Sequence, residues 1–160
     1  MLLTTGPIGR PGYGSFGVLH AHPHNGPVTF YDEIGGHATI HRIVEVFYAG
    51  VAEDELLRPM YPEEDLAPAA ERFTLFLCQY WGGPTTYSEQ RGHPRLRMRH
   101  APFAVTPAAK DRWLHHFRAG LDAVALDPEQ DAQFWDYAQH AAQFMVNTLG
   151  EEDPRAGLSG

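Results

Sequence analysis

Hydrophobic residues recur at helical spacing along most of the chain, most regularly from His37 onward. There the i, i+3, i+4 and i+7 positions hold Ile40, Ile43, Val44, Phe47, Tyr48 and Val51. This spacing places one apolar stripe along an amphipathic helix. Gly35 and Gly36 would break any helix that begins near Phe30, because glycine leaves the backbone unrestrained. We therefore expect a long helix from His37 onward and at most a short stub before it.

The middle of the chain alternates periodic segments with helix breakers. We expect a short element over residues 54–61, interrupted by Pro59, and a longer helix over 65–81 that ends at Gly82. The expected inward face of the longer helix holds Leu66, Ala69, Ala70, Phe73, Phe76, Leu77, Tyr80 and Trp81. Residues 82–94 mix glycines and prolines with polar residues, which predicts an irregular loop, and loops of this length are often functional.

Three further elements complete the pattern. A short segment over residues 95–100 stops before Pro102, because proline disfavours helical backbone in the residue before it. Thr106 followed by proline is a helix-start signal, and it opens a helix through Val124. The same signal at Asp127 opens a last helix, which we expect to reach Leu149. The expected inward residues of these two helices are Trp113, Leu114, Phe117, Leu121, Val124, Phe134, Tyr137, Ala138, Ala141, Ala142, Met145 and Val146. Because we find no strand and no internal repeat, the predicted fold class is all-α.

The length of 160 residues fits a single domain with a continuous core. Residues 1–27 are rich in glycine and proline and almost without charge, so we interpret them as a mobile tail before a domain over 28–150. Residues 151–160 are interpreted as an acidic C-terminal tail. The N-terminal tail contains His20, His22 and His24, an alternating pattern that could chelate a metal but more often stays solvated.

Charge and cysteine content exclude several classes of partner. The formal net charge is -8, whereas a nucleic-acid surface needs clustered positive charge. The one basic cluster runs from Arg91 to Arg99. Cys78 is the single cysteine, so no intramolecular disulfide forms and a cytoplasmic location is the default expectation. No stretch is long and apolar enough for a membrane span, and the start of the chain lacks the features of a secretory signal.

Local motifs do not by themselves identify a reaction. The chain has no HExxH, paired CxxC, P-loop, GxSxG or GxGxxG sequence. Ten histidines are present, and a histidine is more often a surface or core hydrogen-bonding residue than a metal ligand. On periodicity alone, the chain is also compatible with a plain helical bundle without a cofactor.

Four sequence runs together resemble the group II truncated haemoglobins. In order they are FYDEIGG, FYAGVAEDELLRPMYPEEDL, FLCQYWGGPTTYSEQRGHPRLRMRHAPF and DRWL, and the resemblance covers residues 29 to about 149. It implies a two-over-two helical sandwich around haem b, with a shortened first helix. It also implies a loop in place of much of the helix that carries the proximal histidine.

The resemblance assigns the iron ligand to His100 and surrounds the haem with other named residues. Leu96, four residues earlier, would share a face with His100 and pack under the porphyrin. Arg72 and Arg99 match positions that pair with the haem propionates, although each could equally be an exposed ion-pair partner. Tyr87 is a weaker propionate candidate. Phe73, Phe103 and Met145 complete the expected haem contacts.

On the opposite side of the haem the resemblance implies a polar pocket made by Tyr48, Tyr61 and Trp113. The alternative is an aromatic core stripe, since Tyr48 and Trp113 both lie on apolar helix faces. Two donors to a partly negative ligand would slow its release about a hundredfold. By the same resemblance, the small Ala69 would leave the entrance for ligands unblocked. Phe73 stands at a position where leucine is common in the family, and the larger side chain predicts a tighter cavity.

The resemblance implies a protein that binds O₂, CO and NO at ferrous iron. The preferred function is redox or detoxification chemistry on oxygen, nitric oxide or peroxide, of a dioxygenase-like or peroxidase-like kind, with electrons from a separate reductase. The alternative is a non-enzymatic store or sensor of oxygen or nitric oxide.

Overall fold

The computed structural model describes residues 26–148, and every regular element in this range is helical. The three tail histidines and residues 151–160 lie outside the described residues. The elements are α2 (Phe30–Glu33), α3 (Gly36–Ala52), the 3₁₀-helix η1 (Arg58–Met60), α4 (Ala67–Tyr80), α5 (Thr86–Arg91), α6 (Leu96–His100), α7 (Pro107–Val124) and α8 (Pro128–Met145). The predicted all-α class is confirmed.

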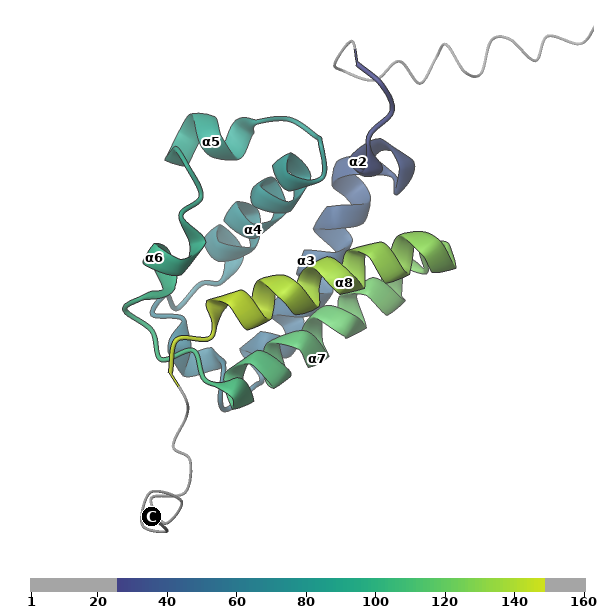
Figure 1. Cartoon of the computed structure of the whole chain (residues 1–160). Coiled ribbons are helices and arrows are strands. Elements are labelled where there is room, and N and C mark those ends of the chain that lie inside the picture. Colours follow the sequence, from purple (N-terminus) through teal and green to yellow (C-terminus); the bar gives the residue numbers. More distant parts are fainter. Residues whose placement is uncertain (1–25, 149–160) are drawn as a thin grey trace, which may run out of the picture.

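The four long helices form two layers, with α7 and α8 in front of α3 and α4 in Figure 1. The main helix contact is between α3 and α7. It is close because α7 carries Gly120, where a Cβ atom would lie 2.6 Å from the Ile43 carbonyl oxygen. The core between the layers is formed by fully buried side chains, Ile40, Ile43, Phe47, Val51, Leu77, Phe117, Leu121, Phe134 and Ala138 among them. This is the expected two-over-two sandwich.

The helix starts follow local chemistry. Gly35 and Gly36 both adopt positive φ, so the chain turns between the stub α2 and the long helix α3, as predicted. Thr106 caps α7 by accepting a hydrogen bond from the Ala109 amide at 3.0 Å. Over residues 54–61, only the three residues of η1 are helical.

The prediction of an irregular loop over residues 82–94 was wrong, because this stretch contains helix α5. Its glycines and prolines lie outside the helix, at the two ends of the stretch. The helix is held from α4 by Gln79, whose side-chain oxygen accepts from the Ser88 amide at 2.9 Å. Its amide nitrogen donates to the Ser88 hydroxyl at 2.6 Å. A contact between two elements therefore stabilises a helix that the local sequence does not indicate.

The last helix is shorter than predicted and ends at Met145, not at Leu149. Val146 leaves the helical conformation, with ψ at 120°. The Asn147 amide then donates to the Val105 carbonyl oxygen at 3.0 Å instead of continuing the helix. Tyr80, expected on an inward face, is 51% exposed and stacks on Tyr137 at 4.0 Å between ring centroids. Between residues 26 and 148, none of the helices has the length and apolar character that a membrane crossing needs.

Candidate functional site

One cavity of about 380 Å³ is lined by residues of both helix layers and of α5 and α6. Its lining contains every residue that the sequence analysis placed in the site: Tyr48, Tyr61, Arg72, Phe73, Tyr87, Leu96, Arg99, His100, Phe103, Trp113 and Met145. Ala69 is also part of this lining, whereas Cys78 is buried elsewhere. Met60 and Phe76 line the cavity too, although the sequence analysis did not assign them to the site. Six helices and two connecting segments thus converge on one mostly apolar space.

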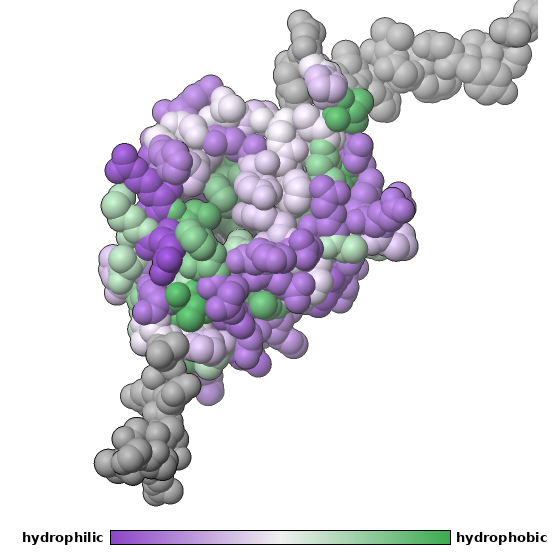
Figure 2. Space-filling model, viewed as in Figure 1, coloured by the Kyte–Doolittle hydropathy of each residue, from purple (hydrophilic) through white to green (hydrophobic). Residues whose placement is uncertain are grey.

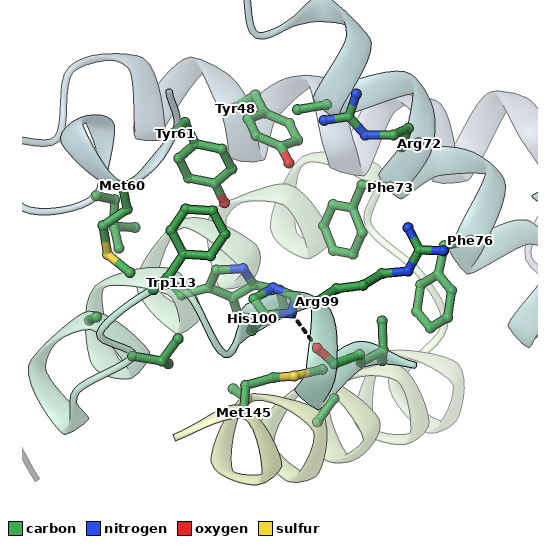
Figure 3. Close-up of a pocket in the computed structure, with 18 of the residues that line it drawn as sticks. Tyr48, Met60, Tyr61, Arg72, Phe73, Phe76, Arg99, His100, Trp113 and Met145 are labelled. Carbon is green, nitrogen blue, oxygen red and sulfur yellow. Dashed lines mark hydrogen bonds between the residues drawn. The ribbon is translucent and has the colours of Figure 1, made fainter. Parts of the chain in front are cut away.

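His100 ends the short helix α6 and reaches into this cavity (Figure 3). Its Nδ1 lies 2.7 Å from the Leu96 carbonyl oxygen, one helical turn earlier. Because a carbonyl oxygen can only accept, Nδ1 must carry the proton. The lone pair of Nε2 is then free for a metal ion, in the arrangement typical of histidine ligands.

The chain around His100 is held by a residue that sequence reasoning missed. The side-chain amide of Asn147 donates to the carbonyl oxygens of His100 at 3.2 Å and Phe103 at 2.9 Å. Its side-chain oxygen accepts from the Val105 amide at 2.9 Å. Asn147 thereby ties the end of α8 to the segment that follows α6. Its partners lie more than forty residues away along the chain, so no local pattern indicates this role.

Tyr48, Tyr61 and Trp113 all line the cavity and come from α3, from the residue after η1 and from α7. The rings of Tyr48 and Tyr61 meet edge to face at 5.6 Å, and both hydroxyls point toward the cavity in Figure 3. The indole of Trp113 stacks on Phe117 at 5.1 Å. Burial raises the pKa of the Tyr48 phenol, and the neighbouring Tyr61 raises it further. Burial also raises the pKa of Tyr61. Both phenols stay protonated near neutral pH and can donate hydrogen bonds.

Phe73 fills the space between these groups. Its ring centroid lies 5.5 Å from that of Phe47, 5.9 Å from that of Trp113 and 6.4 Å from that of Tyr48. The Phe73 side chain thus packs against three aromatic rings, two of which belong to the predicted polar pocket. The smaller Ala69, one turn earlier on α4, is buried beside it.

The two arginines expected at the propionates differ in their surroundings. Arg72 forms an ion pair with Glu63, with 3.1 Å between nitrogen and oxygen, so the alternative of an ion-pair partner holds for this residue. Arg99 donates through Nη2 to the Arg91 carbonyl oxygen at 3.0 Å. Its Nε is buried and has no hydrogen-bond partner within residues 26–148. A buried donor without a hydrogen-bond partner destabilises the folded protein, so we expect a bound ligand to supply the acceptor for this atom.

These features fit a haem group. The cavity is largely apolar, His100 offers an unprotonated nitrogen, and the orphaned Nε of Arg99 suits a carboxylate such as a propionate. The buried Tyr87, whose ring meets that of Phe76 at 5.5 Å, lines the same cavity as Arg72 and Arg99. The residues present therefore match the cofactor that the sequence resemblance implies.

The sequence analysis also missed a buried carboxylate, Asp54, which lies between α3 and η1. Asp54, whose side chain is 2% exposed, accepts from His116 Nε2 at 2.6 Å and from Arg112 Nε at 2.9 Å. It also accepts from the backbone amides of Leu56 and Leu57. Burial alone would raise the pKa of Asp54, but these hydrogen bonds outweigh it and hold the pKa well below its ordinary value. Asp54 thus fastens the segment leading to Tyr61 onto the helix that carries Trp113.

Comparison with known proteins identifies the family of this chain. The model of the family described as Bacterial-like globin matches residues 29–147. The group 2 truncated hemoglobin YjbI of Bacillus subtilis is 38% identical over 123 residues, which cover 77% of this chain and 92% of that protein.

Solved structures of such proteins share the fold. The thermostable hemoglobin of the actinobacterium Thermobifida fusca is 57% identical with a TM-score of 0.74, covering 75% of this chain and 98% of that one. The group II truncated hemoglobin of Bacillus anthracis is 36% identical with a TM-score of 0.74, covering 78% and 100%. Because the family model spans most of the chain and these relatives are matched over nearly their whole length, the chain belongs to the bacterial-like globins and, within them, to the group II truncated haemoglobins.

Proposed function

We propose that this protein retains a diatomic ligand in the pocket of Tyr48, Tyr61 and Trp113 and carries out redox or detoxification chemistry on oxygen, nitric oxide or peroxide. Membership of the globin family supplies the general activity, which is binding of diatomic gases at haem. The observation that carries the finer proposal is the presence of three hydrogen-bond donors, Tyr48, Tyr61 and Trp113, in the lining of the cavity that also contains His100.

Haem, when bound, supplies the iron that takes up the gas and exchanges electrons. We propose His100 Nε2 as its protein ligand, with Leu96, Phe103, Phe73 and Met145 against the macrocycle. We further propose haem b, held without covalent attachment. This is supported by the single cysteine, which lies outside the cavity lining, since covalent attachment uses a cysteine pair next to a histidine.

Charged groups at the rim of the cavity would hold the propionates. Arg99 is the strongest candidate because its buried Nε lacks a partner within the described residues. Arg72 would share its guanidinium between Glu63 and a propionate, which the five donors of an arginine permit. Tyr87 would add a hydroxyl from α5.

The distal residues would act by donating hydrogen bonds. The indole of Trp113 can only donate, whereas a tyrosine hydroxyl can donate and accept at once. One tyrosine can therefore donate to the ligand while the other orients it. Each hydrogen bond to a charged acceptor contributes about 1.5–3 kcal/mol, so two donors slow release about a hundredfold or more. Slow release suits chemistry better than delivery.

Turnover would require electrons from a separate donor protein. Cys78 is the single cysteine, so the chain has no dithiol of its own. Burial raises the pKa of its thiol to about 11, which makes it a poor redox group. We place this chemistry in the cytoplasm, in keeping with a chain that has a single cysteine.

Rapid mixing of the ferrous protein in oxygenated buffer with nitric oxide tests the proposal. We expect consumption much faster than by free haem, and a large loss of rate in Trp113→Leu and Tyr48→Phe. Consumption no faster than by free haem would instead favour a store or sensor of the gas.

A further inference from the structure

A second groove lies on the outer side of the haem cavity, between α6, the end of α4 and the end of α8. Three large hydrophobic side chains are exposed at this groove: Tyr80 at 51%, Met98 at 59% and Phe144 at 57%. Single exposed hydrophobic residues are common, but a cluster along one groove is typical of an interaction site. Figure 2 shows hydrophobic side chains between strongly hydrophilic ones on the side of the molecule that carries α6.

The groove is bordered by positive charge, although the chain as a whole is acidic. Four of the twelve basic residues, Arg91, Arg95, Arg97 and Arg99, fall within nine positions that contain no acidic residue, against a net charge of -8. Within residues 26–148 these four arginines form no ion pair, whereas Arg42, Arg72, Arg112 and Arg118 each pair with a carboxylate. Arg97 is exposed and lies over the Phe144 ring at 5.1 Å. Of these four arginines, Arg95 and Arg97 line the groove, so its rim offers two unpaired cations beside an apolar centre.

The groove is connected to the haem cavity through shared side chains. Leu96 and Met145 line both spaces. The Leu96 carbonyl oxygen accepts the hydrogen bond from His100 Nδ1 at 2.7 Å. A molecule seated in the groove would thus contact a residue that is one hydrogen bond from the iron ligand we propose.

We propose that this groove is the docking site of a small acidic one-electron carrier protein of the flavodoxin class. The inference rests on the proposed function, which needs an outside electron donor. The reduced carrier would lose one electron and ferric haem iron would gain it, and no bond is made or broken. An acidic rim on the carrier would meet the arginines, and its apolar centre would cover Met98 and Phe144. Small interfaces with complementary charge are usual for redox partners.

A second copy of this chain fits the groove less well. In a symmetric dimer each partner presents the same patch, so Arg95 and Arg97 would face their own copies. Like charges brought together oppose association. An acidic partner removes this repulsion and is steered toward the groove over a distance.

The test uses the haem-loaded protein and a purified acidic flavodoxin in its oxidised form. Isothermal titration calorimetry at low and at physiological salt gives the Kd without any turnover. We expect binding that weakens with salt, and a Kd raised about tenfold at low salt in Arg97→Glu and in Arg95→Glu. Arg42→Glu on α3 is the matched control, since it makes the same charge change at an exposed arginine away from the groove, and it should bind within twofold of the unaltered protein.

Other results would overturn the proposal. They are no binding at any salt concentration, a Kd in both groove variants within twofold of the unaltered protein, or tighter binding to vesicles of anionic phospholipid than to flavodoxin. Sedimentation that shows a dimer abolished by Arg97→Glu would assign the groove to a second copy. Because the titration uses oxidised carrier, flavodoxin binding can succeed even where nitric oxide consumption fails, so the two proposals fail separately. Reduction of the ferric protein by reduced flavodoxin should then slow in the same two variants.

Discussion

His116 and Asp54, which lie sixty-two positions apart in the chain, are joined by a buried hydrogen bond of 2.6 Å. Because an ionised carboxylate only accepts, His116 Nε2 must carry the proton and donate it. The bond connects α7 to the segment between α3 and Tyr61, and Arg112 completes it at 2.9 Å. Gly50 on α3 makes room for the imidazole, since a Cβ atom there would overlap His116 Nδ1. The wall that carries the distal donors is therefore held by electrostatics as well as by packing.

Replacing this carboxylate should destabilise the fold. In Asp54→Asn the charge facing Arg112 and His116 is lost while the shape is kept, and we expect the free energy of unfolding to fall by about 3 kcal/mol. Urea unfolding at neutral pH measures this. Asp111→Asn is the control, because Asp111 lies on α7 beside Arg112 and its side chain is 74% exposed. Equal stabilities of the two variants would contradict the role assigned to Asp54.

The lowered pKa of the Asp54 carboxylate predicts how the free energy of unfolding depends on pH. The pKa of Asp54 is lowered in the folded protein, so the unfolded chain binds a proton more readily than the folded one. Its contribution is complete above the ordinary carboxyl pKa of about 4 and is lost progressively as the pH falls below that value. The stability difference between the unaltered protein and Asp54→Asn should thus be constant from pH 7 to pH 5 and shrink below about pH 4. A difference that stays constant down to pH 3 would show that Asp54 is not the titrating group.

The helices that could be predicted from the sequence are those determined by local chemistry. The stripe of α3 and the Thr106 cap of α7 depend on residues a few positions apart, and both appear as expected. Helix α5 was missed because Gln79 of another helix holds it. The end of α8 was placed too late because Asn147 exchanges helical hydrogen bonds for bonds to the segment after His100.

The site residues, too, separate into those that local sequence could predict and those that depend on distant contacts. Periodicity could place Tyr48 and Trp113 on apolar faces, but only the family resemblance separated His100 from nine other histidines. The structure adds a reason, since His100 is the one histidine among the described residues that lines the cavity. Asp54 gave no signal, because its partners Arg112 and His116 lie on a distant helix and one acidic residue in a polar stretch looks solvated.

Removing the imidazole of His100 should abolish normal haem ligation. In His100→Gly the Nε2 ligand is lost while the cavity remains, so the absorption spectrum of the ferrous protein should change and free imidazole should restore it. The exposed His41→Gly on α3 serves as a control for loss of an imidazole elsewhere. A His100→Gly spectrum identical to that of the unaltered protein would place the ligand at another residue.

Trp113 should govern how long dioxygen stays bound. Trp113→Phe keeps an aromatic ring against Phe117 but removes the only hydrogen-bond donor of the side chain. Loss of one hydrogen bond to a charged acceptor, about 1.5–3 kcal/mol, should speed dioxygen release about tenfold to a hundredfold. Stopped-flow displacement by carbon monoxide measures the release rate. Trp135→Phe, whose indole lies against Arg118 outside the cavity, should release dioxygen at the unaltered rate.

Phe73 should limit the entry of ligands. Its ring lies between Tyr48 and Trp113 in the distal wall, and leucine at this position would be smaller and would withdraw from both. Because the small Ala69 is expected to leave the entrance unblocked, we place the tightest point at Phe73 itself. We therefore expect carbon monoxide to associate severalfold faster with Phe73→Leu than with the unaltered protein, as measured by flash photolysis. Phe76→Leu, one turn further along α4 against Tyr87, should change the rate little. An unchanged or slower rate in Phe73→Leu would locate the entry barrier elsewhere in the cavity.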